Sequence, residues 1–278
     1  PTTENFGIQG GVPTHPELLD WLARDFIASG WDVKALCKKI VLSATYRQSS
    51  SAPGKLRQRD PENVLYARGP SRRLPAEMLR DAALANAGLL VPKLGGPPVK
   101  PYQPPGLWKG QNAFLPEYVP DKGEGLYRRS MYTFWRRTSP PPNMLAFDVP
   151  GREVCVVRRQ TTSTPLQPLV LLNDPQFVEA ARGLAERMLR EGGDSLDKRL
   201  TFAFRLAATR NPTAAEVKLL GEHYQRQLAL FRNDPKAAQK LLRVGDHPMP
   251  KGLDAAELAA ATVTASVILN LDAAVMIF

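Results

Sequence analysis

The chain has 278 residues, of which 43% are hydrophobic and 23% charged. This balance is typical of a folded protein with material for one large domain or two small ones, and it argues against a disordered chain. The formal charge of +10 favours anionic partners: nucleic acid, acidic polysaccharide, an acidic protein or a membrane surface. No apolar run approaches the ~20 residues of a membrane-spanning helix. The first 13 residues have the composition of a loop and do not begin with Met, so we expect a fragment or a processed product.

The N-terminal part predicts a helical hairpin. Thr14 and Glu17 have the spacing of a capping box, and the apolar stripe after them predicts a helix that Gly30 closes. A second helix is expected over about 32–46, with its apolar side chains directed inward. Residues 47–72 are polar and rich in Ser, Arg and Pro, which predicts a loop, and helical periodicity resumes over about 75–89.

The middle of the chain is less regular. Residues 91–125 are dominated by Pro and Gly, and their aromatic residues, among them Phe114, favour an ordered loop laid over the surface. Residues 127–176 form an Arg- and Pro-rich block. Its first nine residues have the aromatic content of a strand, and a helix is expected from Thr164 to Leu172.

The C-terminal part, residues 194–272, predicts four helices, over 196–209, 213–231, 234–244 and 254–271. Thr213 and Glu216 have the spacing of a capping box at the start of the second of them. The four helices follow a helix that Asp174 caps and that runs to about Glu191. The sequence therefore predicts a mainly α fold, a helical domain with long Pro/Gly-rich loops and one or two short strands, as a single domain over 1–278.

Arginine is concentrated in the middle block. Seven arginines and only two acidic residues, Asp148 and Glu153, lie between residues 127 and 160. Guanidinium groups bind carboxylate, phosphate or sulfate in a two-pronged manner. The candidates for an anion site are Arg136, Arg137, Arg158 and Arg159. The alternative is that these arginines pair with helix C-termini and with Asp148, Glu153 and Asp174, and hold loops in place.

The other chemical signals are weaker. Of the three histidines, His15 at a helix start is a candidate for acid–base chemistry, provided that the fold brings Asp81 or Asp148 beside it; the alternative for His15 is a local structural role. Glu77 and Asp81 are expected on a solvated helix face. Sequence spacing gives no metal site, and we expect no cofactor in this chain. The two cysteines are expected as buried free thiols, with a disulfide between them as the alternative, and nucleic-acid binding is not expected because no reader motif is present.

Several ordered motifs carry a family resemblance. They include Phe6-Gly7-Ile8-Gln9-Gly10, Gly95-Gly96-Pro97-Pro98-Val99, Arg152-Glu153-Val154-Cys155, Thr164-Pro165-Leu166-Gln167 and Leu171-Leu172-Asn173-Asp174-Pro175. In this order they resemble the planctomycete-type domain of unknown function 1553, over essentially the whole chain but with the N-terminal edge of the domain truncated.

The resemblance implies an exported bacterial multidomain protein, periplasmic or extracellular, with haem c on a c-type cytochrome domain elsewhere in the parent protein. It supplies no reaction. One hypothesis is the C-terminal domain of a cytochrome-linked enzyme that acts on polysaccharide or a related organic substrate. The other is a non-catalytic helical scaffold that docks the cytochrome domain or an acidic surface glycan. A deep pocket lined by Arg158, Arg159, Asp148 and a histidine would favour the enzyme.

Overall fold

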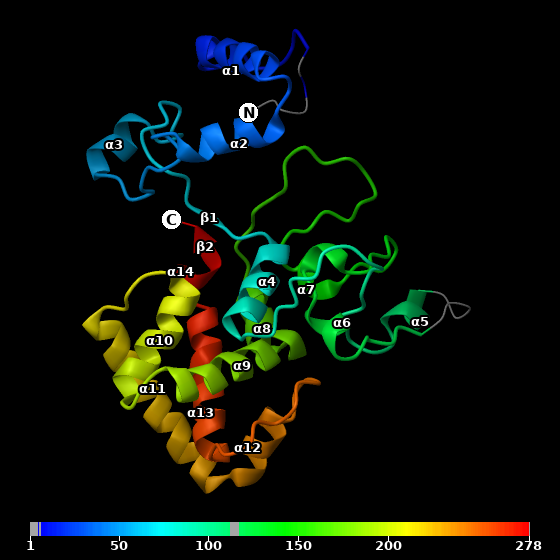
Figure 1. The fold of residues 1–278 in the computed structure, drawn as a ribbon, viewed down its shortest axis with the longest axis vertical. Coiled ribbons are helices and arrows are strands. Elements are labelled where there is room, and N and C mark those ends of the chain that lie inside the picture. Colours follow the sequence, from blue (N-terminus) through cyan, green and yellow to red (C-terminus); the bar gives the residue numbers. More distant parts are fainter. Residues whose placement is uncertain (1–4, 6, 112–116, 278) are drawn as a thin grey trace. The chain divides into compact units, whose positions relative to one another are not determined.

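The computed structural model describes residues 5, 7–111 and 117–277. They form fourteen α-helices, one 3-10 helix and one two-stranded antiparallel sheet, which confirms the prediction of a mainly helical fold (Figure 1). None of these helices is long and apolar enough to cross a bilayer. The chain divides into two compact units, one of Pro1–Arg73 with Met276–Phe278 and one of Leu74–Val275. Each unit is described by itself, and the assignment of 1–278 to one domain stays a prediction.

The smaller unit holds three helices and the sheet. α1 (Pro16–Ala28) and α2 (Val33–Leu42) form the expected hairpin, and β1 (Arg72–Arg73) pairs with β2 (Met276–Ile277). The prediction of a capping box at Thr14 was wrong. The N-cap of α1 is His15, and the Thr14 hydroxyl lies 3.0 Å from His15 Nδ1. The predicted loop over 47–72 contains a short helix, α3 (Gly54–Arg59).

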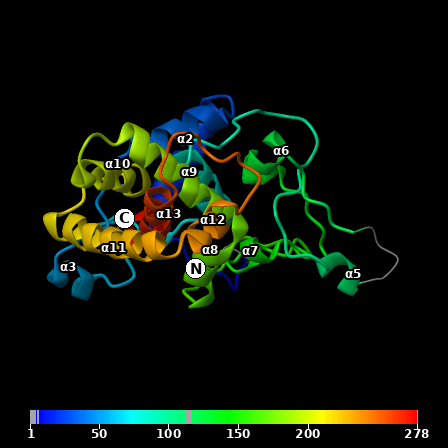
Figure 2. The same ribbon diagram turned by 90° about the horizontal axis from the view of Figure 1, so that it is seen from below.

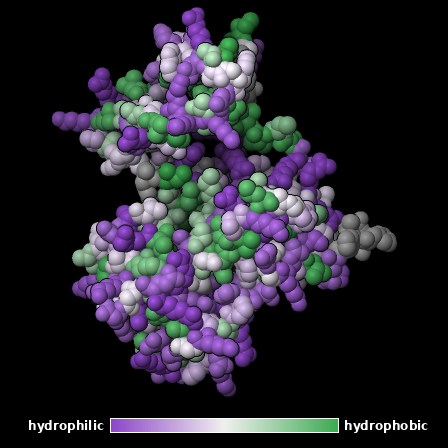
Figure 3. Space-filling model, viewed as in Figure 1, coloured by the Kyte–Doolittle hydropathy of each residue, from purple (hydrophilic) through white to green (hydrophobic). Residues whose placement is uncertain are grey.

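α1 and α2 bury none of their side chains, so the expectation of inward apolar residues was wrong for α2. Val33 and Ile40 are 61% and 43% exposed. The space-filling view shows green apolar side chains among purple polar ones on the unit that carries these helices (Figure 3). Two helices expose apolar residues in this way when a hairpin has no third layer of structure to cover its stripe. Helical periodicity predicted the helices correctly but did not predict their burial.

The larger unit begins with α4 (Ala76–Asn86), which is followed by long irregular segments and five short helices. They are α5 (Leu107–Gln111), α6 (Glu124–Tyr127), the 3-10 helix η1 (Ser130–Tyr132), α7 (Pro142–Leu145) and α8 (Leu166–Asn173). Within 91–125 the described residues are mostly loop, as expected, and Trp108 is buried with its ring 5.1 Å from that of Tyr118. Phe114 lies outside the described residues.

The strand predicted over 127–135 was wrong. This stretch contains the end of α6 and all of η1, and among the described residues its strand-like pairing is limited to isolated bridges, Val91 with Arg128 and Val99 with Thr133. The reason is a tertiary contact: the backbone turns so that the carbonyls of Leu126 and Arg128 face the buried guanidinium of Arg80. A regular strand would direct those carbonyls to a neighbouring strand instead.

The C-terminal helices form a packed bundle (Figure 2). They are α9 (Pro175–Glu191), α10 (Leu196–Ala208), α11 (Ala214–Asn233), α12 (Pro235–Leu242), α13 (Ala255–Leu269) and the single turn α14 (Asp272–Val275). Asp174 caps α9 and Thr213 forms the predicted capping box with Glu216. α13 is buried, as its apolar run predicts, and contacts α9, α11 and α12.

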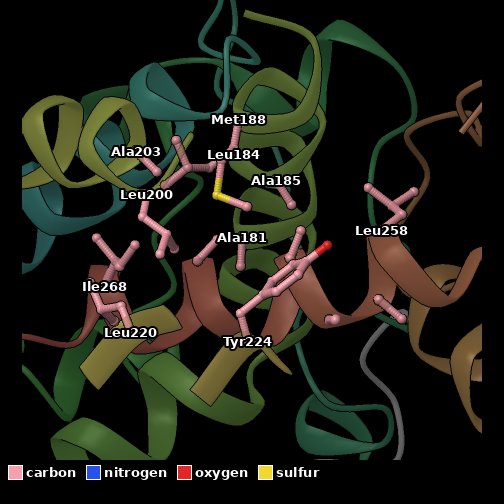
Figure 4. Close-up of a cluster of buried hydrophobic side chains, with 14 of the residues drawn as sticks. Ala181, Leu184, Ala185, Met188, Leu200, Ala203, Leu220, Tyr224, Leu258 and Ile268 are labelled. Atoms are coloured by element: carbon pink, nitrogen blue, oxygen red, sulfur yellow. The ribbon is translucent and has the colours of Figure 1, made fainter. Parts of the chain in front are cut away.

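The core of this bundle combines small and branched side chains with the longer side chains of Met188, Phe204 and Tyr224. Leu184, Ala185 and Met188 from α9 face Leu200 from α10 and Ile268 from α13, and all five are fully buried (Figure 4). A second buried cluster surrounds α4, with Leu79, Leu84, Leu126, Phe147 and Phe177 among its members. This second cluster supports the base of the Arg-rich block, which carries most of the predicted site residues.

Candidate functional site

A long loop joins α7 to α8 and contains three of the six predicted site residues, Asp148, Arg158 and Arg159; residues 148–162 are called the display loop below. In Figure 1 it is the long green stretch that extends away from the helices of its own unit. Its two ends are tied together: the Asp148 carboxylate accepts hydrogen bonds from the Thr162 backbone N–H at 2.8 Å and from the Thr162 hydroxyl at 2.8 Å. Asp148 therefore closes the base of the loop.

Both sides of the display loop are also held. The guanidinium of Arg152 lies 4.5 Å from the centroid of the Trp135 ring, and Trp135 Nε1 donates to the Gly151 carbonyl at 3.2 Å. Asp148 and Arg152 both have φ of 62°, the left-handed region that non-glycine residues seldom adopt. Such conformations persist where the surroundings fix them, and they concentrate at functional loops.

On the far side, Arg159 forms a two-pronged ion pair with Glu77 on α4, with N–O distances of 2.8 and 3.0 Å. The hydrogen bonds that Arg159 donates to the Glu77 carboxylate raise the pKa of Arg159. Burial works to raise the pKa of Glu77, but the hydrogen bonds and charge of Arg159 outweigh it, so the pKa of Glu77 is lowered. Arg159 thus holds the loop in place, but through Glu77 in the first turn of α4, which was not among the expected partners, and Glu77 does not lie on a purely solvated face.

The tip of the display loop is exposed. Val154 and Val157 are 74% and 62% exposed, and Arg158 between Val157 and Arg159 is exposed as well. Among the described residues Arg158 makes no hydrogen bond or ion pair. The tip therefore presents apolar side chains together with a cation that is free to pair with an outside anion.

The four candidate arginines do not meet in one anion site. Arg136 stacks on Trp108, 4.9 Å from the ring centroid, and its Nε donates to the Thr138 hydroxyl at 3.1 Å. Arg137 is exposed. Of the four, Arg158 alone combines exposure with a place on the display loop and no partner within the part of the chain that the structure describes.

His15 belongs to the smaller unit, where its ring stacks on Tyr66 with centroids 4.8 Å apart. Asp148 belongs to the larger unit, where it holds Thr162. Each candidate thus has a local structural role.

Both cysteines are free, as expected, but they are exposed, so the expectation of burial was wrong. The described residues contain no group of three or more His, Cys, Asp or Glu side chains that could hold a metal ion.

Sequence reasoning missed a buried arginine on α4. Arg80 is 3% exposed and donates to Gln176 Oε1 at 2.5 Å, to the carbonyls of Leu126 at 2.6 Å and Arg128 at 2.7 Å, and to the Ser130 hydroxyl at 3.2 Å. Burial lowers its pKa to about 10, which still leaves it charged at neutral pH. Arg80 fixes the backbone at the start of the Arg-rich block.

A second buried network lies on α9. The carboxylate of Glu179, fully buried, accepts from the Tyr127 hydroxyl at 3.0 Å, the Tyr102 hydroxyl at 3.3 Å and the His247 backbone N–H at 2.7 Å. One helix turn further along, the Arg182 guanidinium donates to the His247 carbonyl at 2.5 Å. This network ties three distant segments together around one helix face.

Nearby on the same helix, burial raises the pKa of Glu186, although the charges of His247 and Arg182 oppose the shift. The sequence contained a signal for this network. Three charged residues at helical spacing, Glu179, Arg182 and Glu186, lie on the apolar face of a helix whose other buried residues are mostly small. Buried charges of this kind are paired or hydrogen-bonded.

The fold and these sites define a mainly helical module that has a displayed basic loop and buried polar networks beneath it. A family model described as a protein of unknown function (DUF1553) matches residues 1–224, so the chain belongs to that family. No curated protein and no solved structure matches the chain.

Proposed function

We propose that this chain is a non-catalytic docking module, and that the display loop binds an acidic, partly apolar face of a partner protein. The observation that carries the proposal is the construction of the loop: its base and both sides are fixed, whereas Val154, Val157 and Arg158 at its tip are exposed. Fixing a loop in advance lowers the ordering cost of binding.

The mixture at the tip favours a protein partner. Apolar side chains next to a guanidinium fit a patch of apolar residues with carboxylates at its rim, which is a common composition at protein interfaces. An acidic glycan offers charge but little apolar surface for the valines. A c-type cytochrome domain of the parent protein, periplasmic or extracellular, is the partner that the resemblance in sequence suggests, and this identification is part of the proposal.

The hypothesis of an enzyme that acts on polysaccharide asked for a pocket lined by Arg158, Arg159, Asp148 and a histidine. In the described part of the chain Arg159 pairs with Glu77 and Asp148 holds Thr162. These side chains are used to build the loop, and this supports docking over catalysis at this place.

The test is binding of the 278-residue chain to poly-L-glutamate and, separately, to polygalacturonate as an acidic glycan. Replacing Arg158 by Glu is expected to weaken binding to poly-L-glutamate about tenfold or more at low salt, because an attractive charge becomes a repulsive one. Arg226→Glu on α11 is the matched control, since Arg226 is also exposed.

A second variant, Val157→Ser, separates the apolar contribution from the charge. It is expected to leave binding to poly-L-glutamate unchanged and to weaken binding to the cytochrome domain. If Arg158→Glu and Arg226→Glu reduce poly-L-glutamate binding equally, the display loop is not the site. Tighter binding of polygalacturonate than of poly-L-glutamate would identify a glycan as the partner and overturn the choice of a protein.

A further inference from the structure

A small polar cavity lies where several segments of the larger unit meet. Its lining includes Arg80 from α4, Gln103 from the Pro/Gly-rich loop, Thr133 after η1, Asn143 from α7 and Gln176 from α9. These segments are far apart in the sequence, and Arg80 donates directly to Gln176 at the cavity. The space inside is sufficient for about one water molecule.

Three polar atoms of this lining have no hydrogen-bond partner among the described residues although they are shielded from solvent. They are Gln176 Nε2, Thr133 Oγ1 and Gln103 Oε1. Gln176 and Thr133 are 1% and 7% exposed. Buried polar atoms in folded proteins are nearly always paired with protein or with ordered water, because leaving them unpaired is costly.

The chemistry of the three atoms selects the ligand. Gln176 Oε1 accepts from Arg80 Nε at 2.5 Å, and because a guanidinium nitrogen can only donate, the orientation of this amide is fixed. Its nitrogen therefore needs an acceptor. Gln103 Oε1 needs a donor, and the Thr133 hydroxyl serves in either role. A halide cannot donate to Gln103, and a metal cation cannot accept from Gln176.

Charge at the cavity also favours a neutral ligand. The Arg80 guanidinium lies 3.7 Å from the Asp81 carboxylate and also interacts electrostatically with Asp174. The positive charge is thus already balanced by carboxylates of the protein. An additional anion would meet two negative charges for one positive charge.

We propose that this cavity is a binding site for a single water molecule, which accepts from Gln176 Nε2, donates to Gln103 Oε1 and shares a hydrogen bond with Thr133. Such a water links the Pro/Gly-rich loop to α9 and completes the polar network around Arg80. Waters of this kind make about three hydrogen bonds and are costly to remove. The site would add a fixed point to a loop that has little regular structure.

The experiment is a crystal structure of the 278-residue chain at high resolution, with a second crystal soaked in bromide and measured at the bromine absorption edge. The proposal predicts a water peak within about 3.2 Å of all three atoms and no anomalous signal there. A bromide peak at this place would show an anion site instead. Clear density for the side chains with nothing between them would also overturn the proposal.

Two variants at Thr133 test the role of the water. Thr133→Ser keeps the hydroxyl and is expected to keep the water peak. Thr133→Val has nearly the same volume without the hydroxyl, so the peak is expected to weaken or disappear and the thermal unfolding midpoint to fall below that of Thr133→Ser. Equal peaks and equal midpoints in the two variants would contradict a water bound through Thr133.

Discussion

Replacing Arg80 by Met removes the buried cation around which the start of the Arg-rich block is folded. Methionine fills much of the same space but donates no hydrogen bond. The carbonyls of Leu126 and Arg128 and the amide oxygen of Gln176 would each lose a donor. All three acceptors lie next to a side chain that is only 3% exposed, so water cannot easily replace the lost donor.

The expected loss of stability follows from the number of acceptors left without a donor. Each buried acceptor left without a partner costs about 1–3 kcal/mol, and removing the desolvated charge returns part of this sum. We therefore expect the free energy of unfolding of the larger unit to fall by roughly 3–6 kcal/mol, a large share of the stability of an ordinary domain. The free energy of unfolding of Arg80→Lys should lie between those of Arg80→Met and the native protein, because one ammonium group cannot reach all the acceptors.

The measurement is urea unfolding followed by far-UV circular dichroism, together with hydrogen exchange of peptides over residues 124–133. The matched control is Arg129→Met, an arginine in the same block whose side chain is exposed. It is expected to change the free energy of unfolding by no more than about 0.5 kcal/mol. A loss below about 1 kcal/mol for Arg80→Met, or equal losses in the two variants, would refute the reasoning.

Three further predictions concern other contacts. Gly245 has φ of +92° and a Cβ there would meet the Glu179 carboxylate, so Gly245→Ala should lower the free energy of unfolding by roughly 2 kcal/mol or more, and a change near zero in urea unfolding would contradict this. Hydrogen bonds from Arg210 and the Thr213 backbone lower the pKa of Glu216 from 4.5 to about 2. The contribution of Glu216 to stability is therefore complete above pH 4.5 and is lost as the pH falls toward 2. Glu216→Gln should flatten the pH dependence of the thermal unfolding midpoint over that range, and an unchanged profile would count against this reasoning. Arg128 donates to the carbonyls of Lys93, Gly95 and Pro97, and its guanidinium stacks 3.9 Å from the Tyr132 ring centroid. Arg128→Lys should therefore speed hydrogen exchange in residues 93–99. Unaltered exchange would show that this segment is held by other contacts.

The C-terminal helices were predictable because each has a strong local signal. The Thr213–Glu216 capping box and the Asp174 cap before a proline mark where α11 and α9 begin, and both are present in the structure. The long apolar run that becomes α13 has no polar face, which predicts burial inside a bundle. Local sequence therefore determined both the positions and the packing of these elements.

The Arg-rich block was predicted less well because its conformation depends on a residue far away in the sequence. The aromatic stretch from Tyr127 favours a strand by composition, but Arg80 on α4 binds the Arg128 carbonyl within it and the Leu126 carbonyl just before it, and imposes a turn. Arg80 itself shares the buried face of α4 with Ala83 and Leu84, as its helical spacing allows, but local sequence gives no sign of the distant carbonyls that it binds. Tertiary contacts override local propensity at such positions.

The site residues divide in a similar way. Composition identified the 127–176 block, but it could not distinguish Arg159, paired with Glu77, from its neighbour Arg158, which is exposed at the tip of the display loop. The two arginines are adjacent, and their different roles depend on the position of α4. The burial of Glu179 likewise depends on segments that are distant in the sequence, which supply two tyrosines and the His247 backbone N–H.

The proposed docking role is tested most directly by hydrogen exchange of the native chain with and without poly-L-glutamate, resolved to peptides by mass spectrometry. The account predicts slower exchange in peptides covering residues 150–160 when poly-L-glutamate is bound, and unchanged exchange in α11. In Arg158→Glu this protection should disappear while the exchange of the free protein stays the same. Protection that appears elsewhere, with the display loop unaffected, would contradict the account.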